Sequence, residues 1–205
     1  MALTTVRSTG IGSLPAISGA NLTSLNASNI SSGTLSTSRY VQGGITMADH
    51  WYKNSNSTGN QNPITGWSRM ANTGQGGINA GMTESSGTFT FPSTGIYLVK
   101  FNFNFHVTTG TERFAQAFIR GTDNGFSSTD TAICQATDGA DNFSGNSDID
   151  GGGNEMNTLY DVQNTSNNKI RFSMEFQGGS NTTLIGDSSG GQGRTTVMFI
   201  RLGDT

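Results

Sequence analysis

Apolar residues recur at every fifth position through much of the first 45 residues, a spacing that suits neither regular secondary structure. The residues at this spacing are Leu25, Ile30, Leu35, Tyr40 and Ile45, with Ile17 and Leu22 keeping the same step in a shifted phase. The residues between them are almost wholly Ser, Thr, Asn and Gly, and the segment contains no acid. A helix repeats about every 3.6 residues and a strand about every two, so neither gathers these side chains on one face.

This segment, residues 1–45, is called the arm. Alone it cannot bury enough apolar surface to offset the entropy of ordering it. It is either a flexible tail or a segment that becomes ordered when it wraps around sister chains or docks on a larger body. Flexible Gly/Ser linkers seldom carry apolar residues at a fixed spacing, which favours the second alternative. The residues expected to dock are Ile17, Leu22, Leu25, Ile30, Leu35 and Tyr40.

Residues 46–205, called the body, are numerous enough for one domain with a substantial core. The net charge of −3 argues against binding to nucleic acid, which needs a basic surface. No apolar stretch is long enough to insert into a membrane, and the first residues lack the apolar core of a signal peptide. Cys134 is the single cysteine, so no disulfide forms within one chain, and we expect synthesis in a cytoplasm.

Apolar and polar residues alternate in several segments of the body, which predicts β-strands. The predicted strands are Gly87–Phe91, Ile96–Val107, Phe114–Arg120, Thr158–Val162, Lys169–Phe176 and Thr195–Leu202. The twelve residues of Ile96–Val107 exceed the usual strand length, so we expect a bend or a break within them. The sequence Gln-Asn-Thr-Ser-Asn-Asn, which precedes Lys169–Phe176, has the composition of a hairpin loop. No segment shows convincing helical periodicity.

The last predicted strand is apolar on both faces, so both faces must be covered. In an antiparallel sandwich a partner subunit can supply the second cover. We therefore expect a subunit interface lined by Val197, Phe199, Ile200 and Leu202. The predicted fold is all-β, an antiparallel two-sheet β-sandwich with jelly-roll topology.

The sequence contains no motif of a serine hydrolase, a zinc protease, or a nucleotide- or dinucleotide-binding site. Its two histidines, His50 and His106, are expected at surface, packed or interface positions rather than as a general base or a ligand. With so few histidines and one cysteine the chain offers no zinc quartet. We therefore expect no enzymatic activity.

Eight acids and no base lie between Arg120 and Lys169. The segment from Asn146 to Gly151 spaces oxygen atoms as the first half of a calcium loop does, although Asn157 stands where an EF-hand needs its bidentate Glu. The candidate calcium ligands are Asp138, Asp141, Asp148 and Asp150. The alternative, which we prefer, is a solvated acidic loop.

Trp51 and Trp67 lie among Asn, Ser and Gly residues and are candidates for stacking on a glycan. The alternative, again preferred, places both tryptophans in the core or an interface of the early strands.

The segment GTFTFPSTGIYLVKFNFNF, followed at the end of the chain by TTVMFIRL, resembles the complement globular-head and TNF-like jelly-roll family. That family shows a Phe-x-x-Pro-x-x-Gly-x-Tyr-like signature before a long aromatic strand. The residues at approximately matching positions are Phe89, Pro92, Gly95 and Tyr97. The resemblance covers residues 46–205 and implies a homotrimer packed about a central axis.

The arm sequence GANLTSLNASNISSGTLSTSR resembles the Asn/Ser/Gly-rich repeats that precede receptor-binding heads in bacteriophage tail-fibre proteins. The two resemblances together imply a trimeric stubby fibre or spike, synthesised in the host cytoplasm and carried on the head or tail of the virion. Its arm would bind other virion proteins, and its body would adhere to a host surface glycan without catalysis. The alternative is a purely structural capsid decoration protein or tail adaptor that binds no receptor.

Overall fold

The computed structural model describes residues 44–72, 74–108, 111–128, 130–141, 150–177, 181–188 and 193–205. The chain divides into two units, Met1–Gln42 and Gly43–Thr205, and the described residues belong to the second. The predicted docking residues of the arm, from Ile17 to Tyr40, lie outside the described residues.

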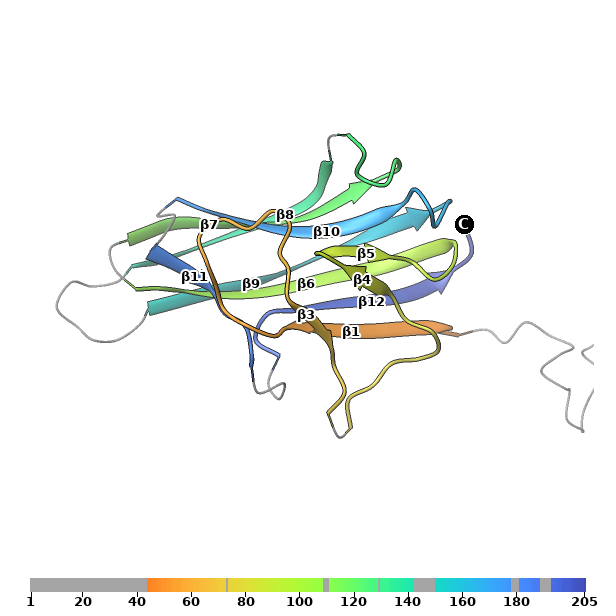
Figure 1. Ribbon diagram of the computed structural model, residues 1–205, viewed down its shortest axis with the longest axis horizontal. Helices are drawn as coiled ribbons and strands as arrows, with labels where there is room; N and C mark the ends of the chain where they lie inside the picture. The colour runs from red at the N-terminus through yellow and green to blue at the C-terminus, as the bar shows by residue number, and fades with distance from the viewer. Residues whose placement is uncertain are drawn as a thin grey trace, which may run out of the picture. The chain divides into compact units, whose positions relative to one another are not determined.

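The described residues form strands and no α-helix, which confirms the all-β prediction. The strands are β1 (Met47–Lys53), β2 (Ser57–Thr58), β3 (Trp67–Arg69), β4 (Thr83–Ser85), β5 (Thr88–Thr90), β6 (Gly95–Val107), β7 (Thr111–Thr122), β8 (Thr131–Asp141), β9 (Asp150–Val162), β10 (Lys169–Phe176), β11 (Thr182–Leu184) and β12 (Thr196–Gly203). They form an antiparallel sandwich whose long strands run along the body (Figure 1).

The first sheet has seven strands in the order β2-β11-β6-β12-β1-β3, with β9 paired to the other edge of β6. The second has five strands in the order β4-β5-β10-β7-β8. Several pairs of consecutive strands are therefore not hydrogen-bonded to each other, and some lie in different sheets, as expected of a jelly roll.

Strict alternation in the sequence produces strict alternation of burial in β6, where every second residue from Gly95 to Val107 is buried. The predicted break does not occur, because β6 runs unbroken over 13 residues. Instead, the pairing along one edge of β6 changes from one strand to another. One edge of β6 pairs with β9 throughout, whereas the other pairs with β12 as far as Asn102 and with β11 from Phe105.

The hairpin predicted before Lys169 is also wrong. Strand β9 pairs with β6 in the first sheet, and β10 pairs with β7 and β5 in the second. The polar loop between β9 and β10 therefore crosses from one sheet to the other. Its composition indicated a turn correctly, but composition carries no information about which sheet the next strand joins.

Aromatic rings from both sheets fill the core. Phe172 on β10 lies 5.0 Å from Phe101 on β6 and 5.6 Å from Phe89 on β5, measured between ring centroids. Phe199 on β12 lies 5.1 Å from Phe89 and closes the same cluster. The Phe172–Phe101 and Phe199–Phe89 contacts join the two layers of the sandwich, and tilted pairs of this kind add to the stability gained from burial.

Candidate functional site

A row of apolar side chains crosses the outer face of the seven-stranded sheet. Residues directly opposite each other on adjacent strands point to the same face, so the strand register defines the row. Ile200 pairs with Ala48 on one side and with Leu98 on the other. Leu98 in turn pairs with Leu159, and Ala48 forms a bridge with Ile78. These five residues, Ile78, Ala48, Ile200, Leu98 and Leu159, are called the apolar row.

The apolar row is open to solvent in the single chain. Leu159 is 62% exposed and Ile78 is 47% exposed, while Ala48, Leu98 and Ile200 are half-buried. With strands about 4.8 Å apart, the row extends for roughly 20 Å across the sheet. Contiguous exposed apolar surface on a soluble chain commonly marks a contact with another protein. The row is therefore a candidate surface for self-association.

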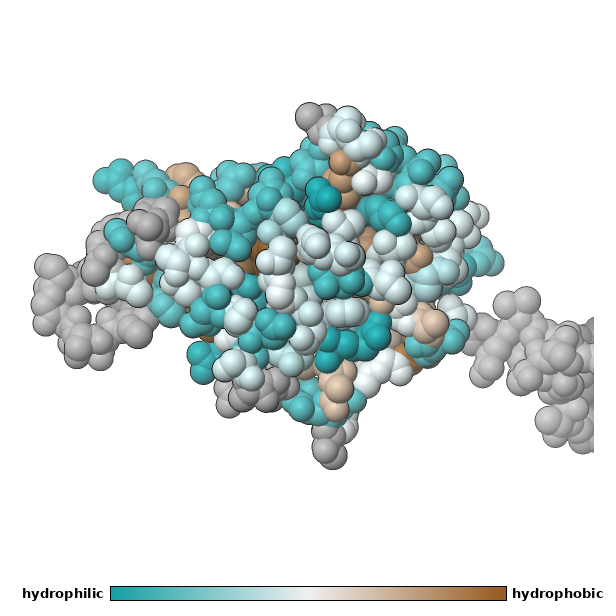
Figure 2. All heavy atoms as spheres, in the orientation of Figure 1, coloured by the Kyte–Doolittle hydropathy of each residue, from teal (hydrophilic) through white to brown (hydrophobic). Residues whose placement is uncertain are grey.

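On one side of the apolar row the same face carries mostly polar residues. The next row contains His50, Met198, Lys100 and Asn157, and the one beyond it contains Tyr52, Thr196, Asn102 and Glu155. Lys100 and Glu155 form an ion pair of 3.0 Å between these rows. In the orientation of Figure 2, hydrophilic and weakly polar residues cover most of the visible surface, with apolar residues only in small separate places.

The structure divides the four predicted interface residues between two faces of β12. Val197 and Phe199 are 1% and 0% exposed and pack in the core, so their assignment to an interface is wrong. Ile200 lies in the apolar row, and Leu202 is 49% exposed next to the register shift between Arg201 and Gly203. The strand is apolar on both faces, as predicted, but the second sheet of the same chain covers the first face.

The suggestion that Trp51 and Trp67 stack on a glycan is wrong, since both are buried. The ring of Trp51 meets Phe89 edge-on at 5.4 Å, and that of Trp67 lies 5.8 Å from Phe172. Both indole nitrogens are occupied: Trp51 Nε1 donates to the Asp49 carboxylate at 2.8 Å, and Trp67 Nε1 donates to the Ile64 carbonyl at 2.9 Å. The preferred alternative, a core position for both, describes them correctly.

Asp138 is the one candidate calcium ligand whose side chain the structure describes. Its carboxylate accepts hydrogen bonds of 2.8 Å from the backbone amides of Gly139 and Gly153. Asp148 and the side chains of Asp141 and Asp150 lie outside the description. Within the described residues no group of three or more His, Cys, Asp or Glu side chains could hold a metal ion.

The calcium site stays a prediction that chelation can test. If calcium binds the acidic stretch in the folded protein, EDTA lowers the melting temperature and added calcium restores it, because a ligand specific to the folded state stabilises that state. The double variant Asp148→Asn/Asp150→Asn should then lose this response. An unchanged melting curve in EDTA supports the solvated loop.

Burial lowers the pKa of His50, with a smaller opposing effect of the Asp49 carboxylate, and burial also lowers the pKa of His106. Both lie on the outer face of the seven-stranded sheet, at positions that alternate with core residues. The unfolded chain binds their protons near the ordinary pKa of about 6.5, whereas the folded chain binds them only at lower pH. Their contribution to stability is therefore complete above about pH 6.5 and is lost as the pH falls through the folded pKa values.

We expect the melting temperature to fall with pH below about 6.5 in the wild type, and less steeply in His50→Gln/His106→Gln, which lacks both histidines. Thermal melts of the two proteins across this range measure the difference. Parallel curves would contradict the assignment of this pH dependence to the two imidazoles.

No helix among the described residues has the length and apolar character needed to cross a membrane. No protein-family model matches the chain, and a search of curated proteins finds no match.

Solved structures do match the fold of the body. The Eiger TNF of S. frugiperda superposes with a TM-score of 0.54 and 12% identity, over 77% of this chain and 93% of that one. Murine APRIL superposes with a TM-score of 0.51 and 13% identity, over 76% of this chain and 98% of that one. The body therefore has a TNF-like jelly-roll fold, as the signature around Phe89 and Tyr97 implied.

Proposed function

We propose that this chain is a non-enzymatic virion structural protein that assembles from three copies, docks on the virion through its arm and adheres to the host surface through its body. The apolar row is the observation that supports assembly, because a second copy would remove Leu159 and Ile78 from water. The number of copies follows from the jelly-roll family that residues 46–205 resemble. The likeness of the arm to tail-fibre repeats is the support for attachment to a virion.

Adhesion can be tested by incubating the labelled full-length chain with a panel of bacterial strains and, in parallel, with the proteins of the purified virion. Attachment to cells that is lost when their surface polysaccharide is stripped supports adhesion to a glycan. Binding to virion proteins with no binding to any cell would instead support the alternative, a capsid decoration protein or tail adaptor.

Removal of residues 1–45 is expected to abolish incorporation into virions and to leave the body folded. The first described strand begins at Met47, and its partners β12 and β3 are both in the body. Residues 46–205 alone should therefore melt at nearly the same temperature as the full chain. A truncated body that fails to fold would contradict the assignment of docking to the arm and of independent folding to the body.

A further inference from the structure

Three basic side chains lie together on the outer face of the five-stranded sheet. Lys169 and Arg171 occupy half-buried positions of β10 that alternate with core residues. Arg120 on β7 lies directly opposite Arg171. Like charges placed opposite each other destabilise a sheet unless other groups compensate them. The chain as a whole is acidic, so a cluster of bases on one face needs an explanation.

Among the described residues, carboxylates pair with only one of these three bases. Arg120 pairs with Asp130 at 3.4 Å and with Glu175 at 3.3 Å. Neither Lys169 nor Arg171 belongs to an ion pair within that part of the chain. These two side chains therefore leave a net positive charge on this region of the sheet.

Threonines on the neighbouring strand β5 hold the two bases that lack a carboxylate. Arg171 Nε donates to Thr88 Oγ1 at 2.8 Å, and the strand register places these residues opposite each other. Lys169 Nζ donates to Thr90 Oγ1 at 2.9 Å, and these residues are likewise opposite. The four residues, called the basic patch, form a quadrilateral of roughly 5 Å by 7 Å between Cα atoms.

Phe126 fixes the arginine of the basic patch. The guanidinium carbon of Arg171 lies 4.0 Å from the centroid of the Phe126 ring, which is a cation–π contact. Phe126 has a φ of 61°, a left-handed conformation that is unusual for a bulky residue. Its amide donates to Thr122 Oγ1 at 3.3 Å, and the preceding Gly125 amide donates to the Asn167 carbonyl at 2.8 Å. Backbone strain of this kind concentrates at ligand sites, where it orients a group before the ligand arrives.

The groups of the basic patch that remain for a ligand are hydrogen-bond donors. The two terminal nitrogens of Arg171 hydrogen-bond to none of the described residues. Lys169 Nζ donates to Thr90 and to the Thr165 carbonyl, which leaves it a third N–H. The hydroxyls of Thr88 and Thr90 accept from the two bases and keep their own hydrogens. Donors alone suit an anion, and a guanidinium edge matches the two oxygens of a carboxylate.

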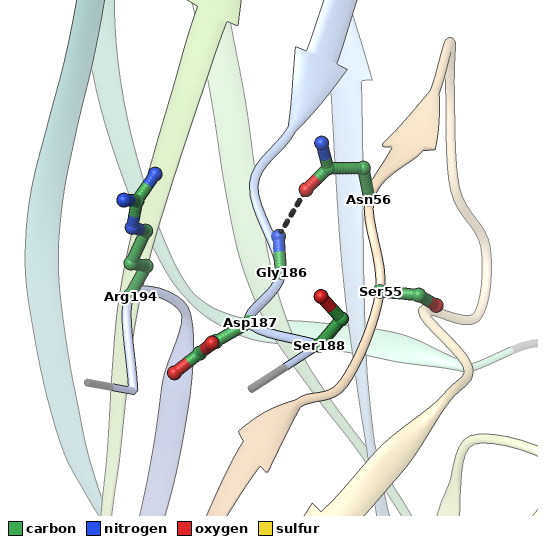
Figure 3. Close-up of a pocket in the computed structure, with 6 residues that line it drawn as sticks. All are labelled: Ser55, Asn56, Gly186, Asp187, Ser188 and Arg194. Carbon is green, nitrogen blue, oxygen red and sulfur yellow. Dashed lines mark hydrogen bonds between the residues drawn. The ribbon is translucent and has the colours of Figure 1, made fainter. Parts of the chain in front are cut away.

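A polar cavity of about 370 Å³ next to the paired strands β2 and β11 differs in this respect (Figure 3). Asn56 Oδ1 in its lining accepts from the Gly186 amide at 2.9 Å. The Asp187 carboxylate accepts from the Gly193 amide at 3.4 Å. These groups already have partners within the chain, and we assign no ligand to this cavity.

We propose that the basic patch binds the carboxylate of an acidic saccharide. This inference rests on the proposed adhesion to a host glycan and names the class of glycan as acidic. It also supplies a location for adhesion after the burial of Trp51 and Trp67 excluded the first one. The apolar row lies on the outer face of the other sheet, so assembly through that row does not use the face that carries the basic patch.

The test titrates the full-length chain with glucuronate, galacturonate and N-acetylneuraminate, followed by calorimetry and saturation-transfer NMR. Glucose and galactose are the matched neutral sugars, while acetate and the acidic peptide triglutamate supply carboxylates without a sugar. We expect at least one acidic sugar to bind with a dissociation constant of about 1 mM, at least tenfold more tightly than any of these four comparison compounds. Added salt should weaken this binding, because it screens the attraction between the charges.

Arg171→Gln and Lys169→Gln should each weaken the binding about tenfold or more, as loss of a hydrogen bond to a charged group does. Arg171→Lys should weaken it as well, since lysine keeps the charge but lacks the planar fork. The matched control is Arg113→Gln, which removes an exposed arginine from β7 of the same sheet, roughly 20 Å along the strand from Arg120. This control should bind the sugar as the wild type does. A thermal melt of each variant checks that it is folded.

The outcomes separate this inference from the proposed function. Three results overturn the assignment of the basic patch, even where the chain still attaches to cells: sugar binding that survives both glutamine substitutions, equal binding of a comparison compound, or no binding of any acidic sugar. Acidic-sugar binding that the patch variants lose, in a wild-type chain that attaches to no cell, supports the patch and overturns adhesion.

Discussion

Replacement of Asp49 by alanine is expected to lower the free energy of unfolding by about 2–6 kcal/mol, since two buried donors left without their acceptor cost about 1–3 kcal/mol each. The Asp49 side chain is only 2% exposed, and its carboxylate accepts from Arg69 Nε at 2.9 Å and Nη2 at 3.1 Å. It also accepts from the backbone amide of Met82 at 2.7 Å and from the indole of Trp51. The alanine variant would leave these last two donors buried without their acceptor.

The matched control is Asp204→Ala. Asp204 also pairs with an arginine, Arg201, but its side chain is 89% exposed, so its loss should cost less than about 1 kcal/mol. Urea unfolding of both variants measures the contrast. Asp49 links β1 to β3 and to the segment before β4. Equal unfolding midpoints for the two variants would show that these hydrogen bonds contribute little to the stability of the fold.

The double variant Leu98→Asp/Ile200→Asp is expected to remain folded and to lose self-association. The two residues face each other in the middle of the apolar row, and in the single chain their side chains are half-buried on the solvent side of the sheet. Two carboxylates there would have to be buried against a second copy, at a cost of several kcal/mol. In a free monomer they stay hydrated.

Sedimentation of the variant and circular dichroism provide the measurement, with Asn102→Asp/Thr196→Asp, a pair on the polar part of the same face, as the control. The control should assemble as the wild type does. If the apolar-row variant retains the mass of the wild-type assembly, the row is not the contact surface.

Local alternation made part of the fold predictable. Lys169–Phe176 was predicted with the bounds that β10 shows, because four apolar residues alternate with polar ones and point into the core. No bounds were predicted for β1, since its core-facing positions include Asp49 and Lys53. Burial lowers the pKa of Lys53, whose ammonium donates to the Thr65 carbonyl at 2.9 Å. A charged residue inside a sandwich conceals the alternation on which strand prediction depends.

The candidate site was less predictable than the strands because it depends on strand register. Leu98 and Ile200 lie about 100 residues apart in the sequence, and only the pairing of β6 with β12 makes them neighbours. The same limit explains the error over Val197 and Phe199: a strand apolar on both faces does not reveal which face the chain itself covers.

The mass of the wild-type chain in solution tests the central claim most directly. Sedimentation equilibrium of the full-length protein at micromolar concentration should give three times the chain mass of 21.5 kDa, and the same multiple for residues 46–205 alone. A stable, folded species with the mass of a single chain would contradict the account, because the apolar row would then remain exposed to water without a partner.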